Sequence, residues 1–113
     1  MLVYLDNCSL QRPLDDKSQL RVHLESEAVL ALLELCEAGE VRLVSSEALL
    51  FEISRTPDRL RRTYAQEVLA KASVQVQTND AVEELARALH EQGIRPLDAL
   101  HLASAVQAAI PQS

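Results

Sequence analysis

The chain has 113 residues, of which 48% are hydrophobic, and its formal net charge is −6. This length suits one domain with a single core, and the apolar content excludes a disordered chain. The acidic balance argues against broad electrostatic capture of nucleic acid, although a bound cation can reverse the charge of a local site.

Two further exclusions concern location. No apolar segment approaches the roughly 18 residues that cross a bilayer, and an acid at position 6 interrupts any N-terminal signal sequence. Cys8 and Cys36 provide no disulfide framework. The sequence therefore predicts a cytoplasmic protein with reduced cysteines and no membrane partner.

The first part of the chain predicts a strand, a loop and a long helix. Leu2–Leu5 is a short continuous apolar run, which is typical of a strand covered on both faces. Residues 8–18 predict a loop, and the helix that follows ends at Gly39. Its inward stripe is expected to contain Leu20, Leu24, Ala28, Leu32 and Leu35, flanked by Val29, Leu33 and Cys36.

Three polar residues mark the starts of further helices. Ser46 follows a second apolar strand, residues 41–46, and caps a helix that ends before Pro57. Asp58 and Asn79 cap two more helices in the same way. The helix after Asp58 is expected to turn four side chains inward: Leu60, Tyr64, Val68 and Leu69.

The remaining elements complete an alternating order. Residues 74–78 alternate between apolar and polar and predict the third strand, and the helix after it ends at Gly93. Pro96 begins the last helix, which runs to about Ala109. Strands separated by helices predict parallel βαβ units with helices on both faces of the sheet. The sequence therefore predicts a single α/β domain over residues 1–113.

Three acids, Asp6, Glu52 and Asp98, have apolar neighbours that predict burial, and topology places two of them, Asp6 and Glu52, near the functional edge of the sheet. Ligands of open α/β sheets bind beyond the carboxyl ends of the strands, and Asp6 directly follows the first strand. Glu52 lies in the second turn of the helix after the second strand, and Asp98 lies in the first turn of the last helix. The helical stripes of the last two acids contain apolar residues, which predict burial: Leu49 and Ile53 for the first, and Leu102, Ala105 and Ala109 for the second.

Clustered carboxylates point to a hard metal ion. Several carboxylates held together repel one another, and their pKa values rise unless a cation compensates. Oxygen-only clusters suit Mg²⁺ or Mn²⁺, which lower the pKa of a bound water and stabilise charge on a phosphate under attack. Asp6, Glu52 and Asp98 are therefore candidate catalytic residues and metal ligands. Two of them also have simpler interpretations, Asp6 as a capping residue and Asp98 as a first-turn acid favoured by the helix dipole.

The segments VYLDNC, VRLVSSEALLFEI and PLDALHLASA resemble, in order and spacing, those of PIN-domain proteins, including the VapC-type toxins of bacterial toxin–antitoxin pairs. The resemblance implies a three-layer α/β/α fold and an endoribonuclease that uses Mg²⁺ or Mn²⁺ to activate water against RNA phosphodiesters. It assigns the family acids to Asp6, Glu52 and Asp98. It also implies an antitoxin protein as a partner.

The resemblance also suggests supporting residues. Many family members carry a hydroxyl residue just after the first acid, and Asn7 or Ser9 corresponds to it here. His101 follows Asp98 by three residues on the same helix. Because His suits softer metals, it is expected to support the site by hydrogen bonding rather than by ligation.

The C-terminal part departs from the family pattern. Family members continue into a further strand with a fourth acid near its end, whereas no Asp or Glu follows Asp98. In the family order 3-2-1-4-5, strands four and five are then expected to be missing, and strand one becomes a bare edge that invites self-association or pairing with a partner. Two hypotheses remain: a metal-dependent ribonuclease, or a catalytically degenerate PIN-like module that self-associates or binds an antitoxin.

A basic segment follows the second candidate acid. Arg55, Arg59 and Arg62 have the spacing of one helix face, although Pro57 interrupts it. They are either a patch that contacts RNA phosphates or a solvated face that balances the acidic helix. Base stacking is expected to contribute little, because the chain has only three aromatic residues: Tyr4, Phe51 and Tyr64.

Overall fold

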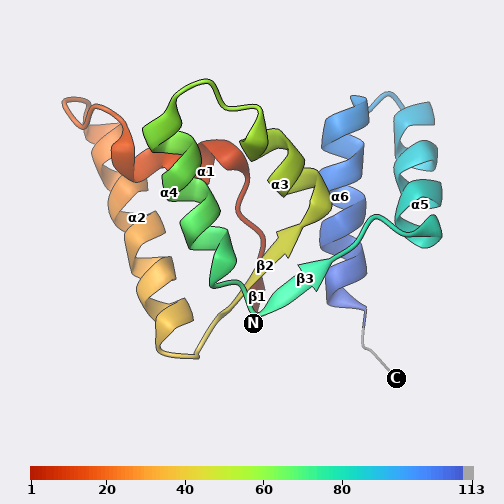
Figure 1. Ribbon diagram of the computed structural model, residues 1–113, viewed down its shortest axis with the longest axis horizontal. Coiled ribbons are helices and arrows are strands. Elements are labelled where there is room, and N and C mark those ends of the chain that lie inside the picture. The colour runs from red at the N-terminus through yellow and green to blue at the C-terminus, as the bar shows by residue number, and fades with distance from the viewer. Residues whose placement is uncertain (111–113) are drawn as a thin grey trace.

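In the computed structural model, which describes residues 1–110, a small sheet lies between two groups of helices (Figure 1). Its strands are β1 (Leu2–Val3), β2 (Arg42–Ser46) and β3 (Val74–Val76). They are parallel and lie in the order β1-β2-β3. The predicted α/β class and the parallel order 3-2-1 are therefore confirmed.

The helices divide between the two faces of the sheet. On one side lie α1 (Asn7–Gln11), the short 3₁₀ helix η1 (Arg12–Leu14), α2 (Leu20–Glu37) and α4 (Arg59–Ala70), and on the other lie α5 (Asp80–Glu91) and α6 (Pro96–Ala109). The remaining helix, α3 (Glu47–Ser54), continues directly from β2. None of the described helices combines the length and apolarity that crossing a bilayer requires.

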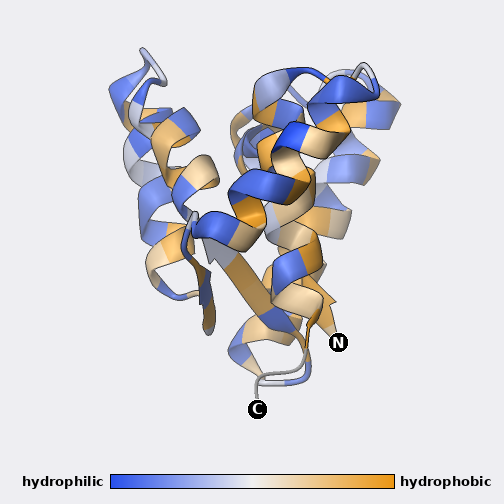
Figure 2. Ribbon diagram, turned by 90° about the vertical axis from the view of Figure 1, so that its right-hand side faces the viewer, coloured by the Kyte–Doolittle hydropathy of each residue, from blue (hydrophilic) through white to orange (hydrophobic). Residues whose placement is uncertain are grey.

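Each face of the sheet has its own core, because successive side chains of β2 point to opposite faces. Leu43 belongs to the core beneath α2 and α4, and Val44 to the core beneath α5 and α6. Figure 2 shows the hydrophobic sheet between helices whose outer sides are largely hydrophilic. The three-layer α/β/α architecture is thus confirmed. The first core contains Leu5, Leu10, Val29, Leu43, Leu49, Ile53, Ala65 and Leu69, and the second Val44, Val76, Val82 and Ala103.

The three predicted helix caps are confirmed. The side chains of Ser46, Asp58 and Asn79 each accept a hydrogen bond from a backbone N–H three residues later, at 3.1, 3.1 and 3.0 Å. These bonds satisfy donors that the first turn of a helix otherwise leaves without a partner. They fix where α3, α4 and α5 begin, and α3 carries one of the candidate acids.

Removal of the cap at Ser46 is expected to destabilise the protein. Ser46→Ala should lower the free energy of unfolding by about 1–2 kcal/mol, because the hydroxyl is buried and bonds both Leu49 N and Tyr4. Asp58→Ala removes an exposed cap of the same type and should cost less. Urea denaturation of both variants measures the difference, and equal losses would contradict the expectation.

Two N-terminal predictions are wrong in detail. The first strand ends at Val3 rather than Leu5, and α1 and η1 occupy residues 7–14, where a loop or an irregular turn was predicted from residue 8. Asp6 caps α1 by accepting the Ser9 N–H at 2.7 Å. Leu10 is fully buried in the first core, so this short helix is held by tertiary packing that a five-residue pattern does not reveal.

The predicted inward stripe of α2 is only partly correct. Leu20 and Leu24 are 72% and 58% exposed, whereas Ser26 and Val29 are buried. The apolar residues of α2 are distributed around its whole circumference, so their spacing does not select one face for burial. The prediction for α4 is wrong at Leu60, which is also exposed.

Candidate active site

The three candidate acids lie on three different elements around the carboxyl edge of the sheet. Asp6 is the cap between β1 and α1, Glu52 lies in α3, and Asp98 lies in the first turn of α6. Asp6 and Asp98 line one hollow of about 400 Å³, which we call the acid hollow. Its lining consists of Tyr4, Leu5, Asp6, Ser9, Asp98, His101, Leu102 and Ala105.

Glu52 lines a different hollow, which is separated from the first by a histidine. This second hollow has a volume of about 470 Å³, and we call it the Phe51 hollow. His101, which lines the acid hollow, hydrogen-bonds Glu52 through Nε2 and Oε2 at 3.0 Å. The structure therefore brings Asp6 and Asp98 together and connects Glu52 to them through His101. The Phe51 hollow is lined by Asn7, Gln11, Phe51, Glu52, Arg55, Thr56, Pro57 and Leu97.

The predicted burial of the acids is wrong for two of them. Asp6 and Asp98 are exposed, and Glu52 is half-buried. The stripe around Glu52 is buried as expected, but α6 buries its opposite side, including Ala99 and Ala103. On the side of α6 that carries Asp98, Leu102 and Ala109 are exposed and Ala105 is half-buried, so this stripe is largely open to solvent.

The carboxylates of the acid hollow retain oxygens for a ligand. Asp6 uses Oδ1 for its cap, and Oδ2 makes no hydrogen bond to the described residues. Asp98 makes no hydrogen bond or ion pair within residues 1–110, and no Lys or Arg lines the hollow. Two acids without a cationic partner form a local negative site that favours a cation.

The carboxylate oxygens of Asp6 and Asp98 suit an ion such as Mg²⁺ that keeps water ligands, rather than a metal that is enclosed by protein ligands alone. Among residues 1–110, no group of three or more His, Cys, Asp or Glu residues is arranged to hold a metal ion. The predicted three-carboxylate cluster is therefore not formed in this part of the chain. Mg²⁺, however, keeps several waters and is commonly bound by one or two carboxylates together with substrate phosphates. Asp6 and Asp98 meet that requirement.

A chain of hydrogen bonds at the site connects Tyr4, which follows β1, with three elements: β2, α3 and α6. Tyr4 Oη lies 2.7 Å from Ser46 Oγ and 2.6 Å from His101 Nδ1. The rings of Tyr4 and His101 also meet edge to face, with their centroids 5.8 Å apart. His101 in turn bonds Glu52. This network fixes the positions of β1, α3 and α6 relative to one another.

One arrangement of protons satisfies every member of this network. Ser46 Oγ accepts the Leu49 N–H, so its own proton is free to go to Tyr4 Oη. The phenol proton of Tyr4 then goes to His101 Nδ1, which leaves the Nε2 proton of His101 for Glu52. Burial raises the pKa of Tyr4, and the nearby charges of Glu52 and Asp6 raise it further, while the hydrogen bond from Ser46 opposes this. The phenol therefore keeps the proton that it donates.

Neither Tyr4 nor Ser46 was predicted to be a site residue. A signal exists, because both lie near the carboxyl ends of their strands, where ligand sites of parallel sheets form. The other supporting candidates have separate positions: Ser9 lines the acid hollow, whereas Asn7 lines the Phe51 hollow. His101 forms the predicted hydrogen bonds at the site.

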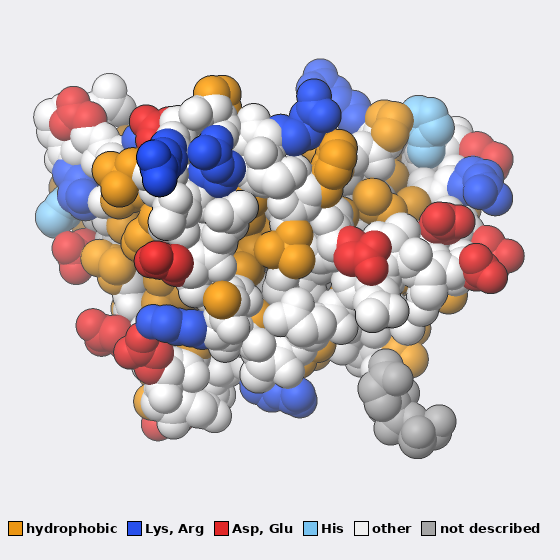
Figure 3. Space-filling model, viewed as in Figure 1, with side chains coloured by type: hydrophobic (Ala, Val, Ile, Leu, Met, Phe, Trp, Pro, Cys, Tyr) orange, Lys and Arg blue, Asp and Glu red, His pale blue; other side chains and the backbone are white. Residues whose placement is uncertain are grey.

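The three candidate arginines do not share one helix. Arg55 follows the end of α3, while Arg59 and Arg62 lie in α4. Arg62 donates to the carbonyl of Thr56 at 2.8 Å and so holds the α3–α4 connection, whereas Arg55 and Arg59 are exposed. Figure 3 shows Lys and Arg side chains along the upper edge of the molecule, where this connection and the start of α6 lie in Figure 1.

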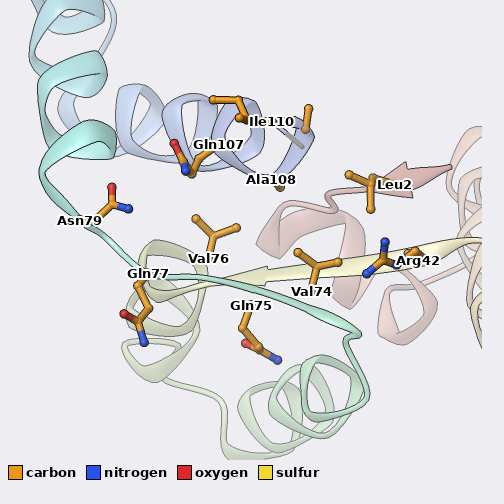
Figure 4. Close-up of a pocket in the computed structure, with 11 residues that line it drawn as sticks. Leu2, Arg42, Val74, Gln75, Val76, Gln77, Asn79, Gln107, Ala108 and Ile110 are labelled. Atoms are coloured by element: carbon orange, nitrogen blue, oxygen red, sulfur yellow. The ribbon is translucent and has the colours of Figure 1, made fainter. Parts of the chain in front are cut away.

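A larger hollow of about 620 Å³ lies away from the acids (Figure 4). It includes the first residues of β1 and β2, Leu2 and Arg42, and the C-terminal end of α6 at Ile110. No Asp, Glu, His or Cys is among its lining residues. It therefore offers no acid–base or metal-binding groups, and the acid hollow remains the candidate site.

Comparison with known proteins identifies a family. No curated protein and no solved structure gave a significant match. The model described as "PIN domain" matches residues 17–112, a segment that contains Glu52, Asp98 and His101 and begins after Asp6. PIN domains form a superfamily of nucleases that typically use divalent metals. Because the match covers most of the sequence and the fold agrees, the chain belongs to the PIN domain family.

Proposed function

We propose that the protein is a Mg²⁺- or Mn²⁺-dependent endoribonuclease of the VapC type. The observation that carries the proposal is the pairing of Asp6 and Asp98 in one hollow with no cationic partner in the described residues. Membership of a nuclease superfamily supports the reaction class. The assignment to RNA and to an antitoxin partner rests on the resemblance of the PIN motifs to those of VapC-type toxins.

The distribution of charge supports a phosphate-containing substrate. The chain as a whole is acidic, yet Arg55 and Arg59 are exposed beside the Phe51 hollow and at the start of α4. Arginine binds phosphate oxygens through several donors in a fixed geometry. A strand of RNA that crosses this rim brings a phosphodiester towards the acid hollow.

Each residue of the site has a separate role in hydrolysis. Asp6 and Asp98 would hold the ion, which when bound supplies the positive charge that activates water and stabilises the phosphate during attack. Glu52 has Oε2 occupied by His101, and its Oε1 makes no hydrogen bond to the described residues. Because Glu52 lines the neighbouring Phe51 hollow, that oxygen would accept the proton of an attacking water that lies between the two hollows. His101 would position Glu52 through the hydrogen bond between Nε2 and Oε2, and its Nδ1 is occupied by Tyr4.

The direct test is cleavage of single-stranded RNA by the purified protein. We expect cleavage in Mg²⁺ or Mn²⁺, and its loss when a chelator is added. Cleavage that continues in excess chelator would contradict a metal-dependent mechanism. No cleavage of any of several unrelated RNAs in Mn²⁺, by protein that binds Mn²⁺, would contradict the ribonuclease assignment.

Binding of Mn²⁺ is expected to raise the thermal stability. A ligand that binds only the native state at ten times its Kd stabilises that state by about 1.4 kcal/mol, which shifts Tm by roughly 5 °C in a domain of this size. The Asp6→Asn/Asp98→Asn double variant should lose this shift. Glu84→Gln, an exposed acid of α5, should retain it. Differential scanning calorimetry measures the three proteins, and equal shifts would exclude the acid hollow as the metal site.

A non-catalytic PIN-like module is the second candidate function. It is favoured by the lack of a three-residue metal-binding group in residues 1–110 and by the exposed apolar residues along α6. Such a module would associate with a second copy or with a partner protein. It predicts a folded oligomer in analytical ultracentrifugation, with no stabilisation by Mn²⁺ and no RNA cleavage. A monomer that cleaves RNA would exclude it. The exposed large apolar residues here are Leu102 and Val106 of α6 and Ile110, which follows it.

A further inference from the structure

The Phe51 hollow contains an aromatic side chain that the fold does not use. Phe51 is 56% exposed, whereas the other two aromatic residues, Tyr4 and Tyr64, are partly buried. It lies on α3 next to Glu52. A single exposed apolar residue is common on protein surfaces and needs no explanation by itself. The sequence predicted little base stacking because aromatic residues are few, but the groups around Phe51 change that expectation at this one position.

A guanidinium group lies over the ring of Phe51. The central carbon of Arg55 is 5.5 Å from the ring centroid, which is within the range of a cation–π contact. Both residues line the same hollow. The pair therefore offers two flat surfaces, an aromatic ring and a guanidinium plane, on which another flat group can stack.

The hollow also has polar groups that remain available. Gln11 is only 8% exposed, and its Nε2 donates to Asn7 Oδ1, while Asn7 Nδ2 donates to Thr56 Oγ1. Gln11 Oε1 makes no hydrogen bond within the described residues. Gln11 therefore keeps one acceptor that can serve a ligand presenting an N–H group.

These features together specify the chemistry of a ligand. The volume of about 470 Å³ lies within the usual range for small-molecule sites. A ring and a guanidinium plane favour a flat aromatic group, the amides favour hydrogen-bonding edges, and the arginine favours an attached phosphate. An unstacked nucleobase in a single strand of RNA combines all three.

We propose that the Phe51 hollow binds one unpaired nucleobase of the substrate, with the base stacked on Phe51 beside Arg55. This inference rests on the proposed ribonuclease function of the acid hollow. The His101–Glu52 hydrogen bond lies between the two hollows, so the base is held on one side of it and the phosphate to be cleaved lies on the other. The substrate must therefore be single-stranded at this position, because a paired base cannot reach the ring.

The test measures RNA binding without cleavage. Fluorescence anisotropy of a labelled single-stranded RNA is recorded in EDTA for the wild-type protein and for Phe51→Leu, which removes the ring but keeps an apolar side chain. The loss of one base-stacking contact should weaken binding about tenfold. Phe51→Trp should restore it, because the indole also stacks. Leu24→Ala is the matched control, since Leu24 has a similar exposure, 58% against 56%, and lies on α2.

A second strand that lacks one base identifies what Phe51 contacts. Strands with a single abasic position, moved along the sequence, should include one that weakens wild-type binding about tenfold and leaves the affinity of Phe51→Leu unchanged. Equal affinity of wild type and Phe51→Leu for the intact strand overturns the proposal. An equal loss of affinity in Leu24→Ala overturns it too. So does a difference in affinity between wild type and Phe51→Leu that remains the same for every abasic strand. A wild-type protein that binds no RNA also overturns it.

The result is distinguishable from failure of the proposed function. Binding that depends on Phe51, in a protein that cleaves no RNA in Mn²⁺, would reject the nuclease but retain the base-binding site. Cleavage in Mn²⁺ by a protein whose RNA affinity is unchanged in Phe51→Leu would retain the nuclease and reject the base-binding site.

Discussion

Asp98→Asn is expected to reduce metal-dependent RNA cleavage by at least about a hundredfold. The substitution keeps the size of the side chain but removes one of the two negative charges in the acid hollow. A bound divalent ion contributes several kcal/mol to the stabilisation of charge in the transition state, and each 1.36 kcal/mol is worth a factor of ten in rate. Single-turnover cleavage of RNA in Mn²⁺ measures the loss.

The fold should tolerate this substitution. Asp98 is exposed and makes no hydrogen bond or ion pair within the described residues, so the free energy of unfolding should change by less than about 1 kcal/mol. Asp6→Asn should be similarly inactive and still folded, because Asn caps helices about as well as Asp. Glu84→Gln on α5 should keep full activity. Wild-type rates in Asp98→Asn would remove the acid hollow from the mechanism.

Local signals in the sequence predicted most of the fold. Ser46, Asp58 and Asn79 cap helices because their side chains bond backbone donors only three residues away, and such contacts depend little on the rest of the chain. The alternation of strands and helices in the sequence predicted the parallel sheet, because strands separated by helices form parallel βαβ units. The positions of Asp6 and Glu52 near the carboxyl edge followed from topology alone.

The errors arose where tertiary packing selects among equivalent patterns. Leu24 and Val29 on α2 are both apolar, but only Val29 meets the first core. Asp98 shares a stripe with apolar residues, yet Leu102 and Ala109 of that stripe are exposed, as is Asp98 itself. In both cases the sequence shows helical spacing, whereas burial depends on which other elements of the chain pack against the helix.

The hydrogen-bond network lay beyond sequence reasoning for the same reason. Tyr4 and His101 are 97 residues apart, and Glu52 and His101 are 49 apart. No spacing rule links such positions. The sequence identified Glu52 and His101 as candidates, but only the fold shows that the histidine takes one oxygen of the acid and so determines which oxygen remains for a substrate.

His101→Leu is expected to be the most destabilising of the site variants. The His101 side chain is mostly buried and holds two hydrogen bonds, to Tyr4 Oη and to Glu52 Oε2. Leucine fills the volume, but Tyr4 Oη and Glu52 Oε2 then lose their hydrogen bonds to the histidine. This loss should lower the free energy of unfolding by about 2–3 kcal/mol. His101→Asn keeps a polar group at the position and should lose less. Urea denaturation in EDTA compares the two.

A double-mutant cycle separates the network from simple packing. Tyr4→Phe alone should cost about 1 kcal/mol, because the phenol bonds both Ser46 and His101. In the His101→Leu background the same change should cost less, because one of those bonds is already gone, and the coupling between the two positions should be about 0.5–1 kcal/mol. Strict additivity would mean that the two side chains do not share a hydrogen bond in solution. Glu52 would then have no positioned partner, and its assignment as proton acceptor would lose its structural basis.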